Sequence, residues 1–287
     1  MRVNIILITY NQEQFVAQAV ESILMQRVND DVQVRVIVAD DCSKDKTLEI
    51  IKSYEKKSPF AFVYLSAEKN LGISKNYQRA IAACDGDYIA ILEGDDWWSC
   101  AKHIEQHIRF LKSHPECSMT MNRISYIRPD IVEPVTFGWN YNEDVYYVDT
   151  ETQITQGNQL GNLSACVIKT NYLKSLDSSL YELYVADWML GVLLSQKGLI
   201  AILKDSTSVY RQNIDSQWAG LTRREQINQL ISLAKIYDNY QDGLCHKYWN
   251  LYIKKLKREK YNKFYKRILP TSLIKLIKYA IGGLKNQ

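Results

Sequence analysis

Three carboxylates, Glu93, Asp95 and Asp96, stand within four residues of one another. They follow residues 88–92, a continuous apolar run that is typical of a fully buried strand. Carboxylates crowded at a strand end repel one another, and a hard divalent cation such as Mg²⁺ or Mn²⁺ is the natural group to offset that repulsion. Such a cation would in turn hold phosphates, so this segment predicts chemistry on a phosphate-containing ligand.

Two earlier apolar runs, residues 3–8 and 34–39, also end in polar residues, and helical patterns separate the runs. The first hundred residues therefore predict the order β-α-β-α-β-α-β and an α/β fold with a mainly parallel sheet. Ligands bind at the carboxyl ends of such strands, so we expect these polar residues to converge with the carboxylates on one edge. The alternative, that they only cap helices and form turns, does not explain acids at successive strand ends. The polar residues after the two runs are Thr9, Tyr10, Asn11, Asp40 and Asp41.

Four segments in order resemble the signature blocks of family 2 glycosyltransferases. Any one block is a weak signal, but four with the right order and spacing are specific. The strong resemblance covers residues 3–115 and weaker matches continue to about residue 218. The segments are Thr9-Tyr10-Asn11, residues 40–47, residues 70–76 and Glu93-Gly94-Asp95-Asp96-Trp97-Trp98.

The resemblance implies the fold called GT-A, a nucleotide-diphospho-sugar transferase fold whose mainly parallel central sheet is flanked by helices. We expect this domain to span residues 1–218 and a basic helical C-terminal appendage to span residues 219–287. Thr222 and Glu225 have the spacing of a capping box before an amphipathic helical pattern. The appendage is therefore predicted to begin with a helix.

The resemblance also implies a reaction, the inverting transfer of one sugar from a nucleotide-diphosphate donor to a glycan hydroxyl. UDP is the expected nucleotide, the sugar is a hexose or N-acetylhexosamine, and the acceptor is a surface polysaccharide or a lipid-linked glycan. Asp95 is the first choice for the Mg²⁺ or Mn²⁺ ligand, and Asp96 is its close competitor. Glu93 would lie nearer the ribose or the sugar.

By the same resemblance, Thr9, Tyr10 and Asn11 line the nucleotide pocket. One of Asp40 and Asp41 would accept a hydrogen bond from the pyrimidine N3–H and the other would hold the loop. Asp41 is also a candidate cap for a helix beginning near Ser43. The diphosphate would lie at the start of the third helix, which Lys69, Asn70 and Lys75 precede or begin, and Asn70 is expected to brace this loop.

The catalytic base of the family stands at a helix start in the second half of the chain, where this sequence has Asp187. An inverting enzyme needs such a carboxylate to accept the proton of the acceptor hydroxyl; the alternative role is an ordinary helix cap. Arg211 is a candidate phosphate or acceptor contact, or else a surface salt-bridge residue. Asn162 and Ser164 are expected on the acceptor side, and Asn213 takes the place of a family histidine.

Charge is unevenly distributed along the chain. Residues 247–287 contain twelve Lys/Arg residues and one acid, Glu259, whereas the other 246 residues sum to −7. Aromatic and aliphatic residues interleave with these cations, and Pro270 would separate two helices. Three interpretations stay open: binding to an anionic membrane surface, packing on the domain, and nucleic-acid binding, which charge alone does not select and which we do not expect.

Composition, with 46% hydrophobic and 24% charged residues, is ordinary for a globular protein. No apolar stretch reaches the ~20 residues that span a bilayer, and no signal region follows Met1, so we expect a cytoplasmic protein, with a peripheral place on the inner face of the membrane as an option. The six cysteines have no metal spacing and are expected to be reduced. His103 and His107 are interpreted as part of a solvated helix face rather than a zinc site.

Two other function classes stay open. A catalytically silent scaffold would keep the fold without turnover, although Asp95, Asp96 and Asp187 argue against it. A nucleotidyltransferase normally has a glycine-rich, basic loop after its first strand, whereas here residues 9–13 are Thr-Tyr-Asn-Gln-Glu. A homo-oligomer is compatible with the sequence, which does not decide the oligomeric state.

Overall fold

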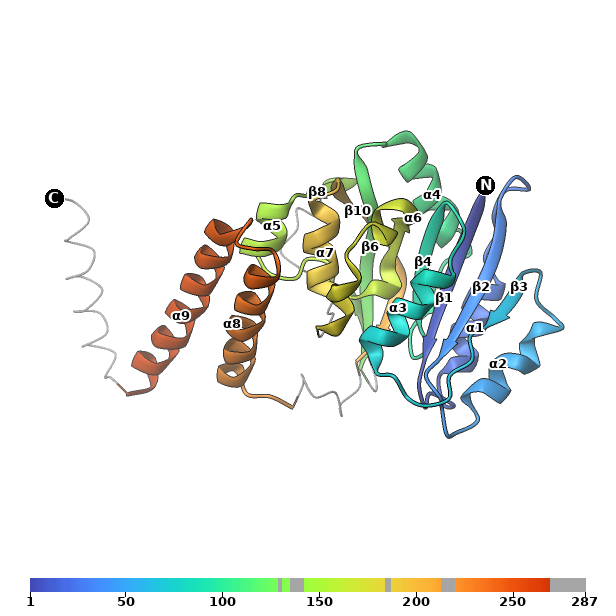
Figure 1. Ribbon diagram of the computed structural model, residues 1–287, viewed down its shortest axis with the longest axis horizontal. Coiled ribbons are helices and arrows are strands. Elements are labelled where there is room, and N and C mark those ends of the chain that lie inside the picture. The colour runs from blue at the N-terminus through green and yellow to red at the C-terminus, as the bar shows by residue number, and fades with distance from the viewer. Residues whose placement is uncertain (129–130, 135–141, 184–186, 213–219, 269–287) are drawn as a thin grey trace. The chain divides into compact units, whose positions relative to one another are not determined.

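The computed structural model describes residues 1–128, 131–134, 142–183, 187–212 and 220–268 (Figure 1). The chain divides into two compact units, residues 1–213 and 214–287. The boundary that the sequence predicts, near residue 218, falls among residues outside the described ranges. We describe each unit by itself.

Strands and helices alternate from β1 to β4, further strands and helices complete the first unit, and two helices form the described part of the second (Figure 1). The strands are β1 (Arg2–Thr9), β2 (Gln33–Asp40), β3 (Ala61–Tyr64), β4 (Tyr88–Glu93), β5 (Trp97–Trp98), β6 (Cys117–Arg128), β7 (Ile131–Pro134), β8 (Val145–Val148), β9 (Cys166–Lys169) and β10 (Leu199–Arg211). The α-helices are α1 (Val16–Leu24), α2 (Thr47–Glu55), α3 (Ile73–Ala83), α4 (His103–Ser113), α5 (Thr150–Thr155), α6 (Thr170–Lys174), α7 (Asp187–Ser195), α8 (Arg223–Tyr240) and α9 (His246–Ile268), and the 3₁₀ turns are η1 (Leu163–Ala165) and η2 (Ser178–Glu182).

The predicted β-α-β-α-β-α-β order of the first hundred residues is confirmed. The described strands form one sheet whose main order is β3-β2-β1-β4-β9-β6-β10-β5. Strands β3, β2, β1 and β4 are parallel, whereas β9 lies antiparallel between β4 and β6. The register sets Thr9 opposite Asp40 and Ile8 opposite Glu93, so the three polar strand ends meet at one edge.

Burial explains why these segments form these elements. The side chains of β1 after Arg2 are at most 7% exposed, as expected for a central parallel strand that is covered on both faces. Helix α1 buries residues at helical spacing, including Val16, Ala19, Val20 and Ile23, against the same core cluster that α4 joins. The hydrophobic core thus holds rigidly the strand ends that carry the polar residues.

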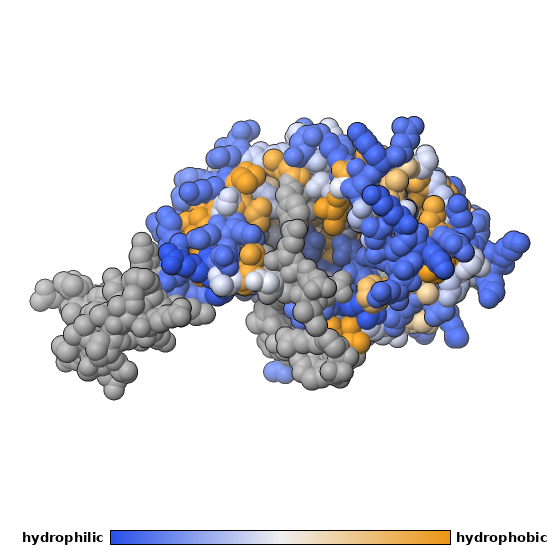
Figure 2. Space-filling model, turned by 90° about the horizontal axis from the view of Figure 1, so that it is seen from below, coloured by the Kyte–Doolittle hydropathy of each residue, from blue (hydrophilic) through white to orange (hydrophobic). Residues whose placement is uncertain are grey.

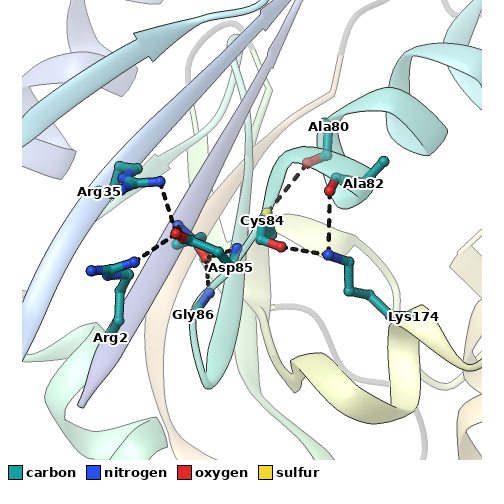
Figure 3. Close-up of polar contacts among 9 residues, drawn as sticks. Arg2, Arg35, Ala80, Ala82, Cys84, Asp85, Gly86 and Lys174 are labelled. Carbon is teal, nitrogen blue, oxygen red and sulfur yellow. Dashed lines mark hydrogen bonds and ion pairs between the residues drawn. The ribbon is translucent and has the colours of Figure 1, made fainter.

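Polar contacts also close the opposite end of the sheet (Figure 3). The Asn4 side-chain oxygen accepts hydrogen bonds from the backbone N–H groups of Asp85 (3.0 Å) and Gly86 (2.5 Å), in the turn before β4. Arg2 and Arg35 form ion pairs with Asp85 at 2.6 and 3.1 Å. These contacts tie the starts of β1 and β2 to β4 and thereby fix the register that aligns their other ends.

Two predictions about local structure are wrong. The helix expected near Ser43 begins at Thr47, after a loop that side chains hold. His103 and His107 do not lie on a solvated face: both are fully buried, and their Nδ1 atoms lie 2.8 Å from the hydroxyls of Thr207 and Thr120. Burial lowers the pKa of His107 to about 4 and that of His103 well below its usual value, so both are neutral.

The second unit begins as predicted. Thr222 caps α8, and its hydroxyl and the Glu225 side chain form the reciprocal capping box. Helices α8 and α9 pack together through buried residues that include Tyr237 and Trp249, whose rings lie 6.0 Å apart. Arg223 pairs with Glu259 across the two helices at 2.9 Å. Among the described residues, no helix combines the length and apolar character that crossing a membrane requires.

Candidate functional site

The ends of β1 and β2 are joined by their side chains. The Thr9 hydroxyl donates to Asp40 Oδ1 at 2.9 Å, and both residues are buried. Asp40 also accepts hydrogen bonds from the Ser43 N–H (2.9 Å) and hydroxyl (2.5 Å). Asp40 therefore holds the loop after β2. The sequence had suggested Asp41, and not Asp40, as the residue that caps the helix after this loop.

Asp41 holds a different loop. Its two carboxylate oxygens accept the backbone N–H groups of Leu71 and Gly72, each at 2.9 Å, and its carbonyl oxygen accepts the Asn70 side-chain amide at 3.3 Å. Helix α3 begins directly after this loop. Asp41 and Asn70 thus place the N-terminus of α3 beside the end of β2.

Residues Tyr10 and Asn11 lie on the exposed side of this edge. Tyr10 is 42% exposed, so its side chain does not pack in the core. Asn11 has a φ of 52°, a left-handed conformation that asparagine tolerates better than most residues. Its backbone N–H donates to the Ser43 hydroxyl and its side chain accepts from the Lys44 N–H, so the loops after β1 and β2 brace each other.

The acidic segment follows the end of β4. One oxygen from each of Glu93, Asp95 and Asp96 lies within 4.8 Å of the other two. Burial and the neighbouring carboxylates raise the pKa of Glu93 well above its usual value. The same causes raise the pKa of Asp96 to about 7. The raised pKa values mean that negative charge is disfavoured in this cluster, and a divalent cation would offset the repulsion that causes this.

Asp187 reaches the same cluster from a different part of the chain. It is the first residue of α7, and burial raises its pKa to about 6. Its charge contributes to the raised pKa of Glu93 and of Tyr77, which places it among the acidic residues. Asp187 and Glu93, far apart in sequence, are therefore close enough to interact electrostatically.

Arg211 lies beside the acidic segment and not in a surface salt bridge of the described residues. Its backbone N–H donates to Asp96 Oδ1 at 2.9 Å and its Nε donates to the Asp95 carbonyl at 3.0 Å. The guanidinium lies 4.5 Å from the ring centre of Phe15 and 5.1 Å from that of Trp97. These contacts bring a cation to the carboxylates.

Lys75 faces another partner. Its ammonium group forms an ion pair with Glu182, in the η2 turn that precedes α7, and donates to the Gln78 side chain at 3.3 Å. The structure therefore places Lys75 between the start of α3 and the segment that leads to Asp187. Asn213 lies outside the described residues.

Sequence reasoning missed several residues of this site. The buried Tyr77 donates its hydroxyl to Glu93 at 2.7 Å. Arg79 donates to the carbonyl of Asp40 and to the Asn76 side chain, so α3 braces the end of β2. In the sequence, these roles are indicated only by the position of Tyr77 and Arg79 in the helix that carries the block at residues 70–76.

Asn162 and Ser164 were expected on the acceptor side, and this expectation is wrong for their side chains. Both are buried, and both donate to Asp96 Oδ2, at 2.8 and 2.6 Å. They therefore contact the acidic segment itself.

Comparison with known proteins places the chain in a family. The model of glycosyl transferase family 2 matches residues 4–163. An uncharacterised protein of Mycobacterium tuberculosis is 28% identical over 223 residues, which are 75% of this chain and 60% of the relative. The putative teichuronic acid biosynthesis glycosyltransferase TuaG of Bacillus subtilis is 29% identical over 45% of this chain and 48% of its own length. The chain thus spans about 60% of the length of the first of these relatives.

Solved structures show the same fold. Residues 1–349 of Staphylococcus aureus TarS, in complex with UDP-GlcNAc, match with a TM-score of 0.61 at 20% identity, over 83% of this chain and 66% of that one. The mannosyltransferase PcManGT of Pyrobaculum calidifontis, in complex with GDP-Man and Mn²⁺, matches with a TM-score of 0.62 at 13% identity, over 98% and 79%. The sheet with its flanking helices is the GT-A fold of these glycosyltransferases, and the family match over more than half of the sequence means that the chain belongs to glycosyltransferase family 2.

Proposed function

We propose that the protein transfers one sugar, with inversion, from a nucleotide diphosphate to a hydroxyl of a glycan acceptor. The observation that carries this proposal is the cluster of Glu93, Asp95 and Asp96 at the end of the parallel strand β4, close enough to Asp187 for its charge to raise the pKa of Glu93. A diphosphate needs a cation, and an attacking hydroxyl needs a base. The acidic residues at this edge would provide ligands for the cation and a base that accepts the proton of the hydroxyl.

The carboxylates fit a divalent cation, Mg²⁺ or Mn²⁺, whose chemistry at this site is to stabilise the charge that develops on the departing diphosphate. Asp95 is the better candidate ligand. Both lone-pair directions of Asp96 Oδ2 are used by Ser164 and Asn162, and Oδ1 accepts the Arg211 N–H, whereas Asp95 is the less buried of the two. The Mn²⁺ in the PcManGT complex supports a divalent cation at this site.

We infer that the nucleotide lies along the edge formed by Thr9, Tyr10 and Asn11. The exposed ring of Tyr10 offers a face for stacking on the base. Asp40 and Asp41 each hold a loop through their carboxylates, and one of the two is proposed to accept the pyrimidine N3–H with a remaining lone pair. UDP is the proposed nucleotide, which the complex of TarS with UDP-GlcNAc supports.

Asp187 is the proposed general base. A pKa of about 6 leaves it ionised at neutral pH and yet basic enough to accept a proton from the acceptor hydroxyl. Glu93, which accepts a hydrogen bond from the Tyr77 hydroxyl, is proposed to lie nearer the ribose or the donor sugar. Arg211 is a proposed phosphate contact. Lys75 is a second one, and to bind phosphate it would exchange its ion pair with Glu182 for the phosphate.

The acceptor is proposed to be a growing surface polysaccharide or a lipid-linked glycan. The match with TuaG, whose name refers to teichuronic acid biosynthesis, supports a cell-surface polymer. The transferred sugar is proposed to be a hexose or an N-acetylhexosamine, with the UDP-GlcNAc complex of TarS in favour of the latter.

We also propose that the protein works in the cytoplasm at the inner face of a membrane. The apolar side of α9, with Trp249, Ile253 and Leu256, is buried. Its exposed side carries Lys247, Lys254, Lys255, Lys257 and Arg258. On the face that Figure 2 shows, the described surface is mainly hydrophilic. This favours electrostatic attraction to anionic lipids over insertion of apolar side chains.

Thermal unfolding with UDP, dTDP, GDP, CDP and ADP, each with and without Mn²⁺, tests the donor site. A ligand that binds only the folded state raises Tm, so we expect an Mn²⁺-dependent rise with UDP. Asp187→Asn should keep this rise and abolish sugar transfer, whereas Asp95→Ala should lose the rise. Full transfer by Asp187→Asn would remove Asp187 as the base, and no rise with any nucleotide would favour a silent scaffold.

A further inference from the structure

Asp96 is enclosed more completely than the other two carboxylates. It is 1% exposed, and three hydrogen bonds from the protein reach its oxygens. Ser164 Oγ and Asn162 Nδ2 donate to Oδ2 at 2.6 and 2.8 Å, and the Arg211 N–H donates to Oδ1 at 2.9 Å. A carboxylate with this many donors is fixed in orientation and less available to an external ligand.

The same serine holds the first residue of the acidic segment. Ser164 Oγ accepts the backbone N–H of Glu93 at 3.0 Å while it donates its own proton to Asp96. One hydroxyl thus joins both ends of the four-residue turn at 93–96, with Asp95 between them. If the hydroxyl is removed, a buried backbone N–H and a buried carboxylate lose a partner together.

The segment that carries Ser164 is itself held in place. The Asn162 side-chain oxygen accepts the Ser164 N–H, and the Ser164 carbonyl accepts the Trp98 indole N–H at 2.7 Å. Asn162, Ser164 and Trp98 are all buried. The contacts of this segment are therefore with the acidic turn and with β5, which follows the turn directly.

We propose that Ser164 and Asn162 are positioning residues that orient the acidic turn so that Asp95 faces the diphosphate. The inference rests on the proposed function, and it gives the two residues a role that acts through Asp95 and Asp96. A carboxylate displaced by about 1 Å from a metal or reacting group costs on the order of a hundredfold in rate. Loss of the serine hydroxyl should therefore weaken the metal-dependent binding of UDP as well as the stability of the fold.

Ser164→Ala and Asn162→Ala test the proposal, with Ser164→Thr as the variant that keeps a hydroxyl. Ser118→Ala is a matched control, because Ser118 is also a buried serine but its hydroxyl has a different partner. It lies at the start of β6 and donates to the Gly198 carbonyl at 3.1 Å. Titration calorimetry of UDP with and without Mn²⁺ measures binding, and thermal unfolding measures stability.

We expect Ser164→Ala to weaken Mn²⁺-dependent UDP binding about tenfold, the loss of one hydrogen bond to a charged group, and Ser164→Thr to restore most of it. Ser118→Ala should lose stability and keep its affinity for UDP. Unchanged affinity in both Ser164→Ala and Asn162→Ala, or an equal loss in Ser118→Ala, would overturn the positioning role alone. Absence of Mn²⁺-dependent binding in the unaltered protein would instead overturn the proposed function as well.

Discussion

Asp187 illustrates how much one residue depends on its surroundings. At a helix start an aspartate normally has a low pKa, because the helix dipole favours its charge. Here burial raises that pKa to about 6. A general base acts only when it is ionised, so its activity is present above that pKa and is lost as the pH falls through it.

The pH dependence of sugar transfer follows from this value. We expect kcat/KM to be level above about pH 7 and to fall about tenfold per pH unit below about pH 6. Initial rates from pH 4.5 to 8, with the affinity for UDP measured at each pH, check this. A rate that stays level down to pH 5 would contradict the role of Asp187 as the base.

Gly94 is a second residue whose type is required by its neighbours. A Cβ at this position would lie 2.4 Å from the Gln12 Oε1 and 2.7 Å from the Thr9 Cγ2. Thr9 is held by Asp40, so the acidic turn would have to shift. We expect Gly94→Ala to lose about 1–3 kcal/mol of unfolding free energy, the usual cost of overpacking, and to weaken UDP binding.

Urea unfolding and UDP titration of this variant check the expectation. Gly220→Ala is the control, because nothing lies within 4 Å of a Cβ built there. Equal UDP affinity in Gly94→Ala and in the unaltered protein would show that the turn tolerates the shift.

At the scale of elements, the site depends on strand register, which is set at the opposite end of the sheet. Asn4 is fully buried and accepts two backbone N–H groups of the turn before β4. Arg2 and Arg35 hold the same turn through Asp85, but these ion pairs are partly exposed and contribute little. Asn4 is therefore the buried side chain that joins the starts of β1 and β4.

Asn4→Ala removes the acceptor of the Asp85 and Gly86 backbone N–H groups. We expect a loss of about 2–6 kcal/mol in the free energy of unfolding, from about 1–3 kcal/mol for each of the two groups. Chemical denaturation followed by circular dichroism measures this loss. Replacement of the exposed Asn239 by alanine should change stability by less than about 0.5 kcal/mol, and a similar small change in Asn4→Ala would contradict the assignment.

At the scale of the whole molecule, the two units differ in charge, because the cations are concentrated after residue 246. In the described part of α9 the side chains of Trp249, Tyr252, Ile253 and Leu256 are buried, whereas Lys247, Lys254, Lys255, Lys257 and Arg258 are exposed and available to a partner. Lys247, Lys254 and Arg258 are spaced seven and four residues apart and share one helix face. Each cation near an anionic membrane contributes about 1 kcal/mol of binding free energy.

Replacement of these three residues by glutamate should therefore weaken binding to phosphatidylserine vesicles by at least about a hundredfold. Co-sedimentation with vesicles at low and high salt measures binding. The control replaces three exposed lysines of the first unit, Lys56, Lys57 and Lys197, in the same way. Equal loss in both variants would indicate non-specific attraction, and binding to RNA but not to vesicles would favour a nucleic-acid partner.

The sequence by itself determined the α/β order, the family and the strand ends that carry the site. Apolar runs that end in acids depend on local residues only, and burial of a parallel strand leaves few other structures for them. The capping box at Thr222 was predictable for the same reason, since it involves residues three apart.

Only the tertiary structure decided which polar side chain holds which loop. Asp40 and Asp41 are adjacent in sequence, yet one bonds Thr9 and Ser43 while the other bonds the loop at residues 71–72. The burial of His103 and His107 and the contacts of Ser164 with Asp96 likewise arise between segments far apart in the chain. Partners of this kind are set by register and packing, which bring together residues that no local pattern relates.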